Sequence, residues 1–275
     1  MFAGLLDLSQ NQFYLFTLVL VRTSGLVLAG PPFGSTEIPT QVRVFLAFTL
    51  AVLIFPGQLG TPVDPPITLA GYMPLVGGEL LVGYTLGTGV VLLLSGVQLA
   101  GQIIGQMSGM TLADLYSPGF DANVPLFSQF LYLVALAAFL LLGGHRLLMI
   151  GMLDTFAAIP PGTAGMSNSL GETVVTLLVQ SFSLGIRVAA PATAALLLAS
   201  LVLGVISRTL PQLNVMALGF GLNALATFSI LAASLAGMAW LFQDEIEPAL
   251  QVVLDAVAGG AKAPASVGNA LRGVP

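Results

Sequence analysis

Apolar residues fill most of this 275-residue chain in long runs, which short Pro- and Gly-rich stretches separate. A helix needs about 20 residues to cross the hydrocarbon core of a bilayer, and most of these runs approach or exceed that length. A further apolar stretch prolongs the fourth run to Ile159, where Pro160-Pro161-Gly162 marks the clearest boundary in the chain. The pattern predicts an all-α, membrane-type protein with about six long apolar helical segments, over residues 13–29, 42–55, 68–94, 126–142, 170–203 and 216–242.

The stretch from Gly96 to Pro125 lies between two of these segments and has a different pattern. At helical spacing, one side collects Ser95, Gln98, Gly101, Gln102, Gly105, Gln106 and Gly109, and the other collects Leu99, Ile103, Ile104, Met107 and Met110. This predicts an amphipathic helix with an uncharged polar face, which ends near Met110 and is followed by a loop. Irregular backbone beside membrane segments survives only where protein covers it or water reaches it, so we expect the loop to face a cavity, a pore or another subunit.

Glycines spaced four residues apart occur on the third segment and on the amphipathic stretch. In lipid, small residues at this spacing let helix backbones approach closely. We expect this helix-packing role, with partner helices supplied by other chains, for Gly83, Gly87, Gly101, Gly105 and Gly109.

Composition supports the membrane class and excludes several others. Hydrophobic residues make up 56% of the chain, charged residues 7%, and the mean hydropathy is +0.99, so an ordinary soluble domain is excluded. The net charge of -5 does not support nucleic-acid binding. With no cysteine, a single histidine at position 145 and no Gly-x-Ser-x-Gly elbow, we predict no enzyme activity, no metal site and no cofactor.

Four charged residues lie beside or within the long apolar runs: Arg22, Glu79, Arg187 and Arg208. A charge in lipid costs at least about 2.5 kcal/mol, so each of these residues must find a partner or reach the headgroups. For Arg22 and Arg208, a headgroup anchor and a subunit contact or translocation path remain equal alternatives. Glu79 and Arg187 lie deeper in their segments, which favours buried partners.

Several motifs resemble one known family. The stretch Gly204–Val215, GVISRTLPQLNV, is similar to the signature of the FliR family of flagellar export-gate proteins, which includes the SctT proteins of injectisomes. Arg22-Thr23-Ser24-Gly25 resembles the family's opening, and Gly101-Gln102 with Val124-Pro125 resembles its centre. The resemblance covers residues 10–245 in order.

The resemblance implies a subunit of the type III flagellar protein export gate in the bacterial inner membrane, at the flagellar basal body. It implies assembly with FliP-type and FliQ-type membrane proteins, and with FlhB-type and FlhA-type export components, around a channel for unfolded export substrates. The expected organisation is a FliP-like part over residues 1–165 with a gate loop at about 105–125, a FliQ-like helical hairpin over residues 166–258 and a disordered tail over residues 259–275.

A channel for unfolded protein must stay closed to ions when idle, which calls for an adaptable apolar constriction backed by neutral polar groups. The resemblance also implies that the loop plugs the closed gate. We predict that the glutamines Gln98, Gln102 and Gln106 form the polar lining and that the gate or plug consists of Met107, Met110, Leu115, Tyr116, Pro118 and Phe120.

Three alternatives remain open at this stage. The chain can be an injectisome export-gate subunit of the same family, or the predicted plug can be an ordinary interhelical loop. A small-solute secondary transporter is an alternative from a different class, because Pro191 beside Arg187 is consistent with a broken helix next to a charge. Co-purification with small apolar proteins favours the gate, whereas a monomer or homodimer favours the transporter.

Overall fold

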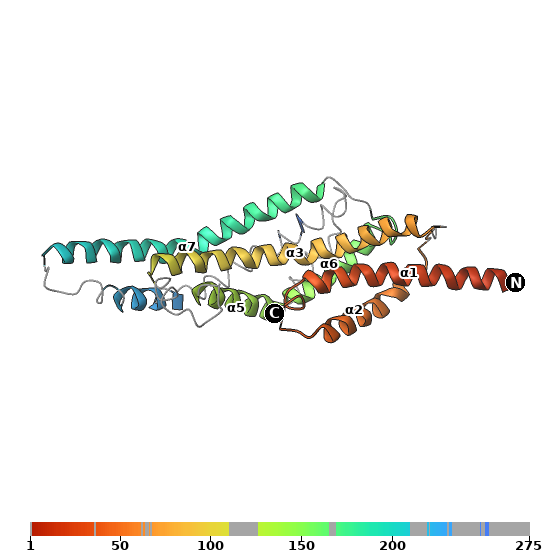
Figure 1. The fold of residues 1–275 in the computed structure, drawn as a ribbon, viewed down its shortest axis with the longest axis horizontal. Helices are drawn as coiled ribbons and strands as arrows, with labels where there is room; N and C mark the ends of the chain where they lie inside the picture. Colours follow the sequence, from red (N-terminus) through yellow and green to blue (C-terminus); the bar gives the residue numbers. More distant parts are fainter. Residues whose placement is uncertain are drawn as a thin grey trace, which may run out of the picture. The chain divides into compact units, whose positions relative to one another are not determined.

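The computed structural model describes residues 2–35, 37–61, 63, 66, 68–109, 126–164, 169–209, 219, 221–229, 231–232, 248 and 251–252. Over these ranges the chain is helical, without a strand, in agreement with the all-α prediction (Figure 1). In chain order the elements are α1 (Phe2–Ala29), α2 (Thr40–Ile54), the 3-10 helix η1 (Phe55–Gln58), α3 (Leu69–Met107), α5 (Leu126–Leu141), α6 (Gly144–Ala158) and α7 (Ser169–Thr209).

The helix ends follow local rules where Pro and Gly occur. Helix α2 begins directly after Pro39 and passes into η1 at Phe55-Pro56. Gly143, with φ +76°, occupies the left-handed conformation between α5 and α6, which favours glycine.

Three boundaries differ from the predicted segments. Helix α1 begins at Phe2 instead of residue 13, and α3 joins the third predicted segment and the amphipathic stretch in one helix. Helix α7 continues past residue 203 to Thr209, so the predicted end of the fifth segment is too early and the first half of the Gly204–Val215 signature is helical.

The chain divides into two compact units. Unit 1 comprises Met1–Val91, Gly143–Leu177 and Ile246–Pro275, and unit 2 comprises Leu92–Leu142 and Leu178–Glu245. The division falls inside α3 and α7, so each of these two helices contributes to both units.

Unit 1 is built around α1. Figure 1 shows α2 lying along α1, where Ala47 and Ala51 are buried. The Phe16 ring of α1 packs edge-on against Phe48 and Phe55, with ring centroids 5.8 and 5.5 Å away. Small residues at the contact and aromatic edges beside it thus hold α2 on α1.

Unit 2 contains a close crossing of α3 and α7. The Ser181 hydroxyl of α7 donates a 2.6 Å hydrogen bond to the backbone carbonyl of Leu92 in α3. A Cβ atom on Gly185 would lie 2.6 Å from the carbonyl oxygen of Gly96, so the two backbones meet where neither helix carries a side chain. Side-chain hydrogen bonds and small residues are the two means by which helices associate in lipid.

The outer surfaces of the helices are strongly apolar. Among the described residues, four helices are long and apolar enough to cross a membrane: Gln10–Ala29, Thr40–Gln58, Leu69–Met107 and Thr173–Thr209. Helices α5 and α6 give a fifth candidate if the pair is counted as one span. These findings fit a membrane-type helical protein.

Candidate functional site

The predicted gate region enters the described structure at the C-terminal end of α3. Its packed side consists of Val97, Ala100, Gly101, Ile104 and Gly105, which are all buried. On its open side, Gln102 and Ile103 are half-buried, whereas Gln106 and Met107 are exposed. Gly101 and Gly105, expected on the glutamine side, lie on the packed side instead. The open side therefore mixes neutral polar side chains with apolar and sulfur-containing ones.

The three glutamines of the predicted polar lining differ in their surroundings. Gln98 is half-buried, and its backbone carbonyl accepts a 2.9 Å hydrogen bond from the Ser128 hydroxyl of α5. Gln102 is half-buried and Gln106 is exposed, one helical turn apart. Their role as a lining stays a prediction.

The end of α3 is defined by a left-handed glycine. Gly109 has φ +75°, and its N–H donates to the Gln106 carbonyl at 3.2 Å. A Cβ atom there would meet nothing within 4 Å, so it is the backbone conformation that favours glycine at this position. The preceding Ser108 is buried, and its hydroxyl donates to the Gly105 carbonyl.

The predicted gate lies largely beyond this point. Met107 is the last residue of α3, with 37% of its surface exposed. The other predicted gate residues lie outside the described residues: Met110, Leu115, Tyr116, Pro118 and Phe120.

The predicted helix-packing glycines find neighbours within this chain. A Cβ on Gly83 would collide with the backbone of Arg22 in α1, and a Cβ on Gly87 would lie 2.5 Å from the Gly30 nitrogen. A Cβ on Gly101 would lie 2.5 Å from the Ser128 Cα of α5. The expectation that other chains supply these contacts is therefore wrong for Gly83, Gly87 and Gly101. The small-residue spacing identified the close approach but not the partner, because the spacing says nothing about which helix is near.

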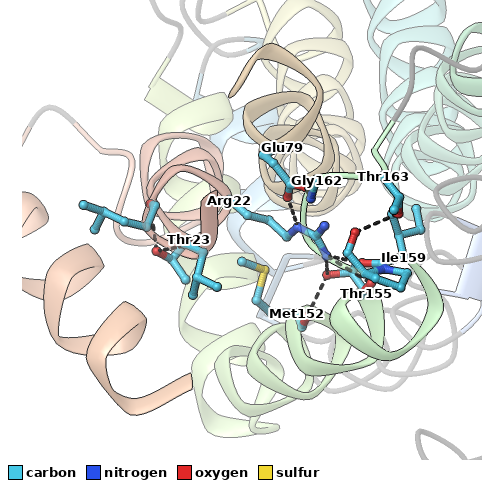
Figure 2. A network of polar contacts seen from close by, with 11 residues as sticks. Arg22, Thr23, Glu79, Met152, Thr155, Ile159, Gly162 and Thr163 are labelled. Carbon is cyan, nitrogen blue, oxygen red and sulfur yellow. Dashed lines mark hydrogen bonds and ion pairs between the residues drawn. The ribbon is translucent and has the colours of Figure 1, made fainter. Parts of the chain in front are cut away.

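The clearest polar cluster of unit 1 is a buried ion pair between α1 and α3. Arg22 Nε donates to Glu79 Oε2 at 2.5 Å, and both side chains are fully buried. Glu79 Oε1 accepts the backbone N–H of Gly162 at 2.8 Å, from the segment after α6 (Figure 2). Glu79 thus has the buried partner predicted for it, and Arg22 is a buried residue rather than a headgroup anchor.

The guanidinium of Arg22 makes further contacts with α6. Its Nη1 donates to the carbonyls of Thr155 and Ile159, at 3.1 and 3.0 Å (Figure 2). Its central carbon lies 4.3 Å from the centre of the Phe156 ring, in a cation–π arrangement. Nη2 is buried and has no hydrogen-bond partner among the described residues. Sequence reasoning missed Thr155, Ile159 and Gly162, because all three contribute backbone atoms, which any residue type carries.

The other two predicted charges lie on α7 and are exposed. Arg187 interacts within the described structure, but it is not buried, so the prediction of a buried site for it is wrong. Arg208 lies in the last turn of α7, where a positive charge favours the negative end of the helix dipole.

Taken together, the long apolar helices, the glycine-mediated crossings and the buried ion pair define an integral membrane-type helical protein. No group of three or more His, Asp or Glu side chains that could hold a metal occurs within the described ranges. The family model described as "Bacterial export proteins, family 1" matches residues 13–249. The chain belongs to this family, the FliR family of flagellar biosynthetic proteins.

Three relatives show how far the similarity extends. The flagellar biosynthetic protein FliR of Bacillus subtilis is 34% identical over 223 residues, which cover 78% of this chain and 84% of that protein. FliR of Aquifex aeolicus is 30% identical over 232 residues, 84% of this chain and 89% of that protein. FliR of Caulobacter vibrioides is 27% identical over 241 residues, 88% of this chain and 96% of that protein.

Proposed function

We propose that this chain is a subunit of the flagellar type III protein export gate in the bacterial inner membrane. The observation that carries the proposal is the family match over residues 13–249, together with relatives named as flagellar biosynthetic proteins and similar over most of their length. The proposed channel passes unfolded export substrates and stays closed to ions when idle.

The lengths of two helices support assembly with other chains. Helices α3 and α7 have 39 and 41 residues, or about 59 and 62 Å at 1.5 Å per residue. Each is about twice as long as the hydrocarbon core is thick. Helix α7 exposes apolar side chains near both ends, including Val175, Val179, Leu201 and Val205. Lipid alone does not cover so long an apolar surface, whereas helices of FliP-type and FliQ-type subunits do.

We further propose the division of the chain given by the family resemblance. Residues 1–165 are the FliP-like part, residues 166–258 the FliQ-like hairpin and residues 259–275 a tail. The FlhB-type and FlhA-type export components complete the apparatus around this subunit.

A deletion of the gene in its own host tests the proposed function. We expect the deletion to abolish secretion of flagellar subunits and swimming, and the full chain supplied from a plasmid to restore both. An affinity-tagged chain extracted from native membranes should bring down small apolar partner proteins. Normal secretion in the deletion strain, or a tagged chain that purifies as a monomer or homodimer, refutes the proposal and favours the small-solute transporter.

The gate itself requires a separate test. We propose that Met107 closes the idle channel together with Met110 and the loop residues Leu115, Tyr116, Pro118 and Phe120, with Gln98, Gln102 and Gln106 as a neutral lining. The exposed Gln106 and Met107 on the open side of α3 support this arrangement. Neutral polar groups and flexible thioethers suit a surface that must adapt to many side chains.

Deleting residues 117–121, or replacing Met107 and Met110 with alanine, should make resting membranes leak small ions while export continues. Ion conductance is measured in vesicles that contain the assembled complex. Unchanged conductance in a correctly assembled deletion variant means that the loop is an ordinary interhelical connection.

A further inference from the structure

The segment that connects α6 to α7 is attached to α1 and α3 by the buried ion pair. Arg22 of α1 donates through Nη1 to the carbonyl of Ile159, at 3.0 Å. Glu79 of α3 accepts the N–H of Gly162 through Oε1, at 2.8 Å. Each residue of the ion pair therefore binds the other through one polar atom and binds the connecting segment through a second polar atom (Figure 2).

The connecting segment forms a tight turn that needs such an acceptor. Thr163 N–H donates to the Pro160 carbonyl at 3.1 Å, Pro161 occupies the second position, and Gly162 occupies the third with φ +85°. These are the features of a type II β-turn. The N–H of the third residue takes no part in the hydrogen bond that closes a β-turn, so the N–H of the half-buried Gly162 needs an acceptor from elsewhere. Glu79 supplies this acceptor.

The Arg22 guanidinium binds backbone carbonyls at the end of α6. The carbonyls of Thr155 and Ile159 lie at the C-terminus of α6, the end of a helix that carries partial negative charge. The Thr155 carbonyl also accepts the N–H of Ile159 at 2.9 Å. Arg22 donates to both carbonyls while its flat face covers the Phe156 ring. A positive charge from another helix thus caps α6 at its last turn.

A third contact fixes the other end of the segment. A Cβ on Gly78 would collide with the backbone carbonyl of Ala164, so this carbonyl rests directly on the α3 backbone. Gly78 precedes Glu79 in sequence, and the two residues together hold both sides of the turn.

We infer that Arg22 and Glu79 are a positioning pair, whose role is to fix the turn Pro160–Thr163 and so the course of the chain toward α7. The inference goes beyond the proposed function, because it concerns how this chain orders its own connection whether or not it works in export. A pair that served only to neutralise two buried charges would be replaceable by two apolar residues without any effect on the turn.

Distance measurements between two spin labels test the role in the full-length chain reconstituted in lipid. The chain has no cysteine, so the labels attach only at introduced positions. Thr163→Cys places one label on the exposed end of the turn, and Met73→Cys places the other on α3, where Met73 is 59% exposed. We expect one narrow distance distribution in the otherwise unchanged chain.

The test variant is the double substitution Arg22→Met with Glu79→Met, which leaves no unpaired buried charge and so keeps the helices packed. We expect its distance distribution to be broader by about twofold or more, because the turn loses its attachments and samples several conformations. Arg22→Lys keeps the charge but cannot donate to Glu79 and to two carbonyls at once, so a smaller broadening is expected.

Arg43→Met is the matched control. Arg43 of α2 also donates to loop carbonyls, those of Ser35 and Ile38, but these lie on the connection before α2. A narrow distribution in this control, beside a broad one in the double variant, supports the positioning role. A narrow distribution in the double variant, or equal broadening in the Arg43 control, overturns it.

Discussion

The contact between α1 and α3 leads to a prediction in which one substitution has opposite effects at two positions of the same helix. Gly83 and Gly77 both lie within α3. A Cβ on Gly83 would lie 2.9 Å from the carbonyl carbon of Arg22 and 3.0 Å from the nitrogen of Leu26, whereas a Cβ on Gly77 would meet nothing within 4 Å. We expect Gly83→Ala to destabilise the protein and Gly77→Ala to stabilise it.

The magnitudes follow from these distances. Alanine in place of glycine within a helix contributes about 1 kcal/mol, and this gain applies to both variants. Non-bonded carbon atoms prefer about 3.5–4.0 Å, and the carbonyl oxygen of Arg22 would lie closer to the new Cβ than the carbonyl carbon of Arg22 or the nitrogen of Leu26, so Gly83→Ala forces α1 and α3 apart by about 1 Å or more. Overpacking of this kind costs about 1–3 kcal/mol, and a rigid backbone neighbour favours the upper end. The net effect is a loss of about 2 kcal/mol for Gly83→Ala and a gain of about 1 kcal/mol for Gly77→Ala.

Heating experiments on detergent extracts measure the difference. The fraction of full-length chain that stays soluble is followed against temperature for the unchanged protein and both variants. The midpoint should fall by several degrees for Gly83→Ala and rise slightly for Gly77→Ala. Equal midpoints for the two variants, or a higher one for Gly83→Ala, would show that backbone contact does not limit the size of residue 83.

Three further predictions concern other positions of the chain. Arg22→Ala should lower the stability of the folded chain by about 3–5 kcal/mol, because it leaves Glu79 buried without its partner. Arg22→Met with Glu79→Met should lower it less, so its midpoint in the same heating assay should be higher. Equal midpoints would contradict this reasoning. Gly101→Ala should lower the midpoint, because the added Cβ would lie 2.5 Å from a backbone atom of α5, but Gly105→Ala should not, because its nearest neighbour is a side chain at 3.7 Å. Arg208→Lys should reduce co-purification with partner proteins if Arg208 holds a carboxylate with two parallel hydrogen bonds, and a normal yield would assign it to the headgroups.

Local features of the fold were predictable because they depend on neighbouring residues. The helix that contains the glutamines was predicted to end near Met110, and α3 ends at Met107 before the left-handed Gly109. The fifth segment was predicted to end at residue 203, before the polar residues of the signature, but the chain is helical to Thr209. Polarity alone does not end a helix.

Pairings between distant segments were not predictable in the same way. The cost of a buried charge showed that Glu79 needs a partner, but Arg22 is 57 residues away, and Thr155 and Ile159 are 133 and 137 residues from Arg22. The depth of a charge within its apolar segment favoured a buried partner for Arg187, which is exposed, and left Arg22, which is buried, undecided. Charge placement in a membrane protein predicts that a pair exists, while the packing of whole helices decides its members.

The separation of Arg22 and Glu79 also matters for synthesis of the chain. At about 5–20 residues per second, the 57 residues between them take roughly 3–11 s to make. During this interval α1 carries a charge without its partner, and such a charge opposes release into lipid by at least about 2.5 kcal/mol. We therefore expect α1 to enter lipid together with α3, once Glu79 can pair with Arg22, and not ahead of it.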